Sequence, residues 1–110
     1  MLQAVDFASV RGAGTGGRAI GRVFFHGNRP ADTADRVLLS KTLLPTELPL
    51  INAAAIVTET GGALDHVAAQ ARERGIPAVV GAAGALSVFA DGDLVLVDGD
   101  AGLVVRLAGG

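Results

Sequence analysis

The sequence predicts one α/β domain in which parallel and antiparallel strands are combined with two or three helices. Two patterns support this prediction: a strand, a helix and a strand follow one another over residues 54–80, and two apolar runs flank an Asp-Gly turn over residues 91–107. The chain has 110 residues, 50% of them hydrophobic, so we expect a single domain over residues 1–110 with one core. Its 16 glycines indicate many tight turns.

Two strands are expected in the first half of the chain. Arg18–Phe25 (RAIGRVFF) follows a glycine-rich turn, and Arg36–Ser40 (RVLLS) is short, aliphatic and bounded by polar segments. Thr46 has the side chain of a helix N-cap, which predicts a helix over residues 46–55. Pro49 would lie in the first turn of that helix, where a missing amide hydrogen costs little.

A βαβ unit is expected next. Residues 54–58 (AAIVT) form a continuous apolar run, which is typical of a strand buried on both faces. A helix is predicted over His66–Arg74, with Asp65 as its N-cap and Gly75 as its C-terminal stop. Ala78–Val80 then begins another buried strand, and the crossover between the two strands should be right-handed.

The C-terminal segment predicts a β-hairpin. Its two apolar runs lie on either side of the sequence DGDAG, residues 98–102, and Asp-Gly is a pair that hairpin turns favour. A calcium loop would need more oxygen ligands at fixed spacing and a closing Glu, which this segment lacks. We therefore interpret its acidic turns as structural.

Composition argues against several classes of function. The formal net charge is −2 and no aromatic platform is visible, which argues against nucleic-acid binding. Cysteine is absent and the two histidines are far apart, so neither a thiol nucleophile nor a zinc site is expected, and we predict no metal ligands. The N-terminus lacks the pattern of a signal peptide, and no apolar run is long enough for a membrane span; we expect a soluble, cytoplasmic protein.

Two other motifs carry little functional weight. Gly12, Gly14 and Gly17 spell G-x-G-x-x-G, but a dinucleotide fingerprint must open a helix, and here a predicted strand follows. We interpret these glycines as a plain turn. His26 lies in a polar, loop-like segment and is expected to be a surface residue.

The segment Gly61–His66 gives the strongest indication of chemistry. The first amides of a helix have no intrahelical partner and attract anions, and Gly61 and Gly62 allow the backbone to approach a ligand closely. A neutral imidazole at that place has a nucleophilic nitrogen that could receive a phosphoryl group. Spacing alone nevertheless favours an ordinary exposed residue at the start of a helix.

A longer pattern surrounds this histidine. The stretch TETGGALDHVAAQARERGIPAVVG, residues 58–81, resembles the signature of the phosphohistidine, or swivelling, domain of the PEP-utilising enzymes. That family includes pyruvate phosphate dikinase, phosphoenolpyruvate synthase, Enzyme I and rifampicin phosphotransferase. The matching residues are Thr58, Gly61, Gly62, Leu64, His66, Ala68, Ala71, Arg72, Glu73, Gly75, Ile76, Pro77, Ala78, Val79, Val80 and Gly81. Segments upstream and downstream also match, so the resemblance covers nearly the whole chain.

The resemblance implies a fold and a role for each site residue. The fold would be a three-layer β/β/α swivelling domain, with a largely parallel sheet and a smaller antiparallel one. His66 would be the phosphoryl acceptor, and Arg72 with the Gly61-Gly62 turn would orient the phosphoryl group or the ring. Leu64 belongs to the same phosphate-binding turn.

Asp65 departs from the family pattern, in which the residue before the histidine is usually Ser, Thr or Cys. A carboxylate caps a helix well, yet it repels a phosphoryl group that carries about −1.5 to −2 charges. It could instead orient the imidazole and stabilise its protonated form. The sequence leaves these roles open.

The resemblance also implies partners. The relatives' chemistry needs an ATP-grasp nucleotide-binding domain and a PEP-binding barrel or acceptor domain, for which 110 residues leave no room. ATP or phosphoenolpyruvate would be the distal phosphoryl source, with Mg²⁺ on the partner domains and no cofactor bound by this chain. We expect a phosphoryl carrier that is one component of a phosphotransferase, with its partner domains either on separate chains or in other parts of a longer protein; a stand-alone relic is the third possibility. The alternatives are a non-catalytic binding or regulatory module of the same fold, and a small-anion site without covalent chemistry.

Overall fold

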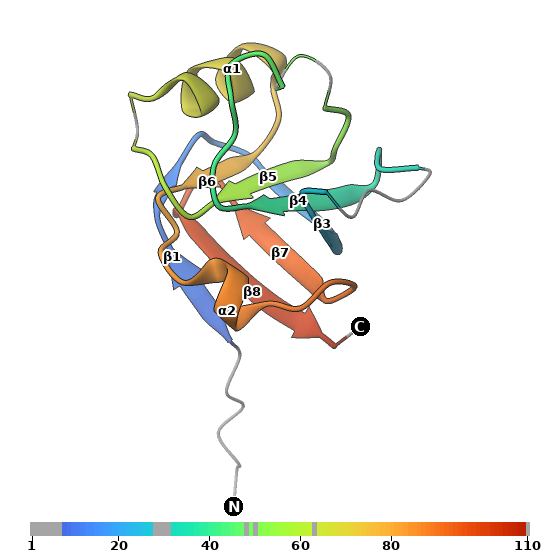
Figure 1. Ribbon diagram of the computed structural model, residues 1–110. Coiled ribbons are helices and arrows are strands. Elements are labelled where there is room, and N and C mark those ends of the chain that lie inside the picture. Colours follow the sequence, from blue (N-terminus) through green and yellow to red (C-terminus); the bar gives the residue numbers. More distant parts are fainter. Residues whose placement is uncertain (1–7, 28–31, 48, 50, 63, 110) are drawn as a thin grey trace, which may run out of the picture.

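The computed structural model describes residues 8–27, 32–47, 49, 51–62 and 64–109. In these ranges the chain forms eight strands and two helices (Figure 1). Their bounds are β1 Ser9–Arg11, β2 Ala13–Gly14, β3 Arg18–Phe25, β4 Arg36–Ser40, β5 Ala55–Thr58, α1 His66–Arg74, β6 Ala78–Val80, α2 Ala85–Val88, β7 Leu94–Asp98 and β8 Leu103–Ala108.

All eight strands belong to one continuous sheet in the order β1-β8-β7-β3-β4-β5-β6-β2. The strands β3, β4, β5 and β6 pair in parallel, and β1, β8, β7 and β3 pair antiparallel. Figure 1 shows α1 above the parallel strands and the strands β7, β8 and β1 below them. The predicted three-layer β/β/α class is therefore confirmed, and strand β3 joins the parallel half to the antiparallel half.

Two hydrophobic clusters separate the three layers. Successive side chains of a strand point to opposite faces, so Val37 and Leu39 of β4 enter one cluster and Leu38 enters the other. The first cluster continues to Val95 and Val97 of β7, and it fills the space between the two halves of the sheet. The second lies beneath α1. Because both faces of β4, β5 and β6 are covered, the sequences of these strands are almost entirely apolar runs.

The sheet curls so far that its two edge strands are neighbours in the sequence. Strands β1 and β2 stand at opposite ends of the strand order, yet only Gly12 separates them. The Gly12 amide donates to the Gly102 carbonyl at 2.9 Å, and a Cβ at position 12 would collide with the Val80 carbonyl oxygen. Glycine is thus required here by close packing of backbone against backbone, and the predicted plain turn is partly strand.

The βαβ unit and the hairpin agree with the sequence patterns. Helix α1 has the predicted bounds, with Asp65 as N-cap and Gly75 as a left-handed C-cap at φ 69°. Strand β5 begins one residue later than predicted, at Ala55. Strands β7 and β8 pair antiparallel across residues 99–102.

The predicted helix over residues 46–55 is wrong for the described part of that segment. Residues 45–47 form turns, residues 51–53 have no regular structure, and Ala55 already belongs to β5. Leu43, Ile51 and Ala53 are all buried in the cluster beneath α1. These three side chains pack in one cluster with residues of α1, and this tertiary packing overrides the N-cap signal of Thr46. Within the described part of the chain, both helices are much shorter than a bilayer crossing requires.

Candidate functional site

The candidate site lies at the carboxyl edge of the parallel strands, where the loops after β4 and β5 meet. Thr60 ties these two loops together, because both its amide and its Oγ1 donate to the Lys41 carbonyl at 3.0 Å. The Thr60 carbonyl in turn accepts from the amide of Gly81 at 3.1 Å. Three consecutive parallel strands thus deliver their loops to one place, as is usual for ligand sites in such sheets.

Asp65 caps α1 and packs against the glycine turn. Its Oδ1 accepts a hydrogen bond from the Ala68 amide at 2.9 Å, so the carboxylate occupies one of the amides that an anion at this helix start could use. Gly61 has φ 103°, and a Cβ on it would collide with Asp65 Oδ2. A Cβ on Gly81 would lie 2.6 Å from the Gly61 carbonyl oxygen. The glycines therefore give the capping carboxylate its space.

His66 is the first residue of α1 and its side chain is exposed. Its Nε2 lies 2.7 Å from the carbonyl oxygen of Leu43, in the loop after β4. A carbonyl oxygen only accepts hydrogen bonds, so Nε2 carries the proton in this contact. In the neutral ring the nucleophilic lone pair is therefore on Nδ1. A reaction at Nε2 would begin with the ring leaving the Leu43 carbonyl.

The structure brings only some of the remaining predicted site residues to this centre. Gly62 and Leu64 lie in the turn before α1, whereas Arg72 lines a hollow at the C-terminal end of the helix, away from His66. Gly62 has open space on its Cβ side, and its carbonyl accepts from the Asp65 amide at 3.0 Å. Leu64 is 97% exposed. Arg72 lies between one and two turns further along α1, and it lines a hollow of about 250 Å³ with Thr15 and its neighbours. Its action on the phosphoryl group stays a prediction.

Sequence reasoning missed the loop that faces His66. Glu47 Oε1 accepts from the Leu44 amide at 2.9 Å, and Glu47 Oε2 lies 2.5 Å from Nε2 of His26. The bond from the Leu44 amide, together with the bond and charge of His26, lowers the pKa of Glu47 below its ordinary value, although partial burial opposes this shift. One signal pointed here: the loop follows a buried parallel strand, so it had to reach the same sheet edge as Gly61.

A second hollow, of about 340 Å³, lies beside His26 and Lys41 at the same sheet edge. It is lined by Phe25, His26, Leu39, Ser40, Lys41 and Leu86. Among the residues that the structure describes, no group of three His, Asp or Glu side chains is placed to hold a metal ion.

Comparison with known proteins identifies the family. Residues 33–102 match the family model for the mobile domain of PEP-utilising enzymes, which is more than half of the chain. The chain belongs to this family. The matched part of this mobile domain runs from the segment before β4 to the turn after β7, and it includes α1 and His66.

The matched part of the domain is close to half identical in sequence to the corresponding segments of several curated relatives. It is 49% identical over 72 residues to chondramide synthase cmdD of Chondromyces crocatus, covering 64% of this chain and 2% of that protein. It is 46% identical over 69 residues to the phosphotransferase YvkC of Bacillus subtilis, covering 62% of this chain and 8% of that protein. It is 49% identical over 69 residues to the phosphoenolpyruvate synthase of Aeropyrum pernix, covering 62% of this chain and 8% of that protein. The domain thus spans less than a tenth of these relatives' length.

Two solved structures resemble the mobile domain. A solution structure of Enzyme I (nEIt) superposes with a TM-score of 0.60 and 35% identity over 66% of this chain and 30% of that one. Aconitase X of Thermococcus kodakaraensis, in its holo-form, gives a TM-score of 0.73 at 22% identity over 90% of this chain and 98% of that one. The second similarity shows the shared fold alone.

Proposed function

We propose that this mobile domain is a phosphoryl carrier in which His66 is transiently phosphorylated. The observation that supports the proposal most is an exposed imidazole at the first position of α1, in a domain of the PEP-utilising family. In the forward step an imidazole nitrogen attacks phosphorus, and an N–P bond forms. The bond from phosphorus to the donor's bridging oxygen breaks, and that oxygen keeps the electron pair.

Residues of this chain position the imidazole ring and its proton for this step. Asp65 and the Gly61 turn fix where α1 begins and thus the place of the ring. Leu43 fixes which ring nitrogen carries the proton. Most of the chemistry of phosphoryl transfer is positioning and charge stabilisation around the donor. We therefore assign the binding of the phosphoryl donor and of Mg²⁺ to partner domains. An ATP-grasp partner would bind ATP, and a PEP-binding barrel or acceptor partner would bind phosphoenolpyruvate or the acceptor. We place this reaction in the cytoplasm.

The test is intact-mass measurement of the chain after incubation with the nucleotide-binding partner from its own organism. One arm contains Mg²⁺ and ATP, and the other contains Mg²⁺ and phosphoenolpyruvate with the PEP-binding partner. An acid-labile phosphoryl adduct on the wild type, absent from His66→Ala, is the expected result. If no adduct forms in either arm, or the adduct persists in His66→Ala, the carrier proposal is wrong.

Two observations favour a second candidate, a binding or regulatory module that retains the fold. The negative charge of Asp65 stands directly before His66, and Nε2 is already engaged by Leu43. Such a module would bind its partner equally well in the wild type and in His66→Ala, as measured by calorimetric titration. It would show no phosphorylation in either form, so a labelled wild type would exclude this role.

A further inference from the structure

The contact between His66 and Leu43 depends on a loop that has its own supports. The Leu43 side chain is 1% exposed and belongs to the cluster beneath α1, whereas its carbonyl faces the His66 ring. The next residue, Leu44, is 59% exposed. The loop therefore turns outward immediately after the contact, so packing of Leu43 alone does not determine the path of the chain that follows.

Glu47 closes this turn in two ways. Its amide donates to the Leu44 carbonyl at 3.0 Å, and its Oε1 accepts from the Leu44 amide at 2.9 Å. Leu44 and Glu47 thus exchange two hydrogen bonds, one from the backbone and one from the side chain. Because the Leu44 amide and the Leu43 carbonyl belong to the same peptide group, the bond to Glu47 also fixes the direction of that carbonyl.

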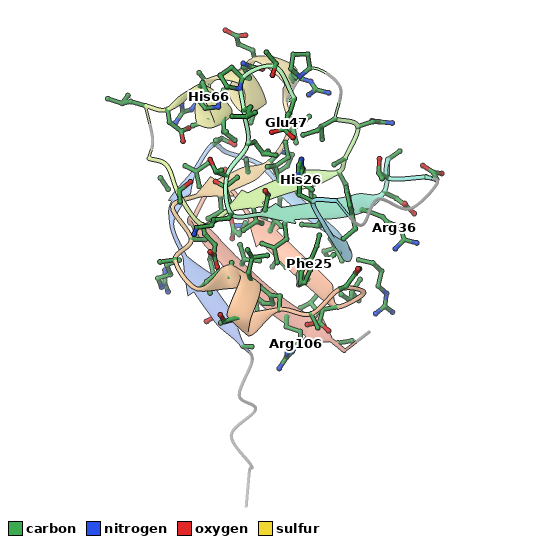
Figure 2. All side chains as sticks on the ribbon, in the orientation of Figure 1. Phe25, His26, Arg36, Glu47, His66 and Arg106 are labelled. Carbon is green, nitrogen blue, oxygen red and sulfur yellow. The ribbon has the colours of Figure 1, made fainter. Side chains whose placement is uncertain are left out.

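His26 holds the other carboxylate oxygen. Its Nε2 lies 2.5 Å from Glu47 Oε2, and the two side chains are 39% and 30% exposed. His26 directly follows β3, so the sheet itself supports the far side of the turn. Figure 2 shows His66, Glu47 and His26 following one another from the region of α1 toward the sheet. The two histidines are therefore connected through the Glu47 carboxylate and the peptide group between Leu43 and Leu44.

We propose that Glu47 is a positioning residue for His66. With His26 it orients the peptide between Leu43 and Leu44, and the Leu43 carbonyl then keeps the imidazole in one orientation with the proton on Nε2. The inference deepens the proposed function, since the orientation and tautomer of His66 decide which nitrogen can attack phosphorus.

The test is the tautomer of His66, measured by long-range ¹H–¹⁵N correlation NMR on the ¹⁵N-labelled chain. The spectra are recorded at about pH 8, where an ordinary imidazole is neutral. The wild type should show the Nε2–H form of His66. Glu47→Ala removes both side-chain contacts of residue 47 and should give a mixture of the two tautomers.

Two further variants separate positioning from general damage. Glu47→Gln keeps an oxygen for the Leu44 amide but loses the second carboxylate oxygen that contacts His26 Nε2, so its His66 spectrum should be intermediate. Glu73→Gln makes the same change on an exposed position of α1 and should leave the His66 spectrum as in the wild type. An unchanged His66 spectrum in a folded Glu47→Ala, or an equal change in Glu73→Gln, would overturn the proposal.

If Glu47→Ala does not fold, the decision rests on Glu47→Gln and His26→Gln, because each changes only the contact between the side chains of residues 26 and 47. An unchanged His66 spectrum in both would then overturn the proposal. The measurement needs no phosphoryl donor, so its result is independent of the carrier function. A tautomer that responds to Glu47 in a chain that is never phosphorylated refutes the carrier role and leaves the positioning role standing.

Discussion

Gly61 and Gly62 are neighbours in the sequence, yet replacement by alanine should affect them differently. Gly61 has φ 103° and no room for a Cβ beside Asp65, whereas Gly62 has open space. Gly61→Ala should lower the free energy of unfolding by about 2–3 kcal/mol, from left-handed strain and a displaced helix cap. Gly62→Ala should change it by less than about 0.5 kcal/mol. Urea unfolding measures both, and equal losses would contradict the packing described.

Asp65 combines a structural role and an electrostatic one, which substitution can separate. Serine and asparagine also cap helices, so Asp65→Ser and Asp65→Asn should change the free energy of unfolding by less than about 0.5 kcal/mol. Both remove the negative charge beside the ring of His66, and both should therefore be phosphorylated several-fold faster than the wild type. Quenched-flow labelling measures the rate, and an equal or slower rate would contradict the view that this charge opposes transfer.

The turn between β7 and β8 depends on Asp98. Its Oδ1 accepts from the amides of Ala101 and Asp100, each at 3.0 Å, and its Oδ2 pairs with Arg18 at 3.2 Å. The Ala101 amide is the main cause that lowers the pKa of Asp98 below its ordinary value, with Arg18 and Asp100 adding to it against partial burial. The ionised carboxylate is thus favoured in the folded state.

A lowered pKa fixes how stability depends on pH. The folded-state pKa of Asp98 lies below the unfolded value of about 4, so its contribution is fully present above about pH 4 and is lost as pH falls through the folded pKa. Asp98→Asn should be less stable than the wild type at pH 7, and the difference should shrink toward about pH 3. Urea unfolding across this range checks it, and a difference independent of pH would contradict the account.

The sequence predicts most reliably those elements in which the local conformational preference agrees with the tertiary packing. Helix α1 has a capping carboxylate at Asp65 and a glycine stop at Gly75, and the sequence predicted its bounds correctly. The segment after Thr46 has a similar cap signal, but Ile51 is buried in the cluster beneath α1. This burial, and not the cap signal, determines the conformation of the segment. The contact between His66 and Leu43 joins residues 23 positions apart and involves a backbone oxygen, which no side-chain pattern reveals.

At the scale of the whole molecule, the two clusters on either side of the parallel strands should dominate stability. Leu38 of β4 is fully buried, whereas Ile20 of β3 is 58% exposed. Leu38→Ala should lower the free energy of unfolding by about 2–5 kcal/mol, and Ile20→Ala by less than about 1 kcal/mol. Urea unfolding compares them, and similar losses would show that the layers are not packed as described.

The three-layer arrangement followed from the sequence as a resemblance to a family, supported by the apolar runs of β5 and β6 and by the hairpin. The curling of the sheet could not be predicted from the sequence. It depends on backbone contacts around Gly12, and the strands on either side of this residue are too short to show an alternating pattern of apolar residues. The consequence for function is a compact arrangement in which loops from several strands meet beside one exposed ring.

The most direct test of the central claim is to locate the phosphoryl group in a chain with only two histidines. After incubation with the nucleotide-binding partner and Mg²⁺-ATP, or with the PEP-binding partner and Mg²⁺-phosphoenolpyruvate, fragment mass spectra at neutral to alkaline pH identify the labelled residue. We predict one phosphoryl group per chain, at His66, in both the wild type and His26→Gln, and none in His66→Ala. A label on His26 or on a hydroxyl residue, or no label under either condition, would contradict the account.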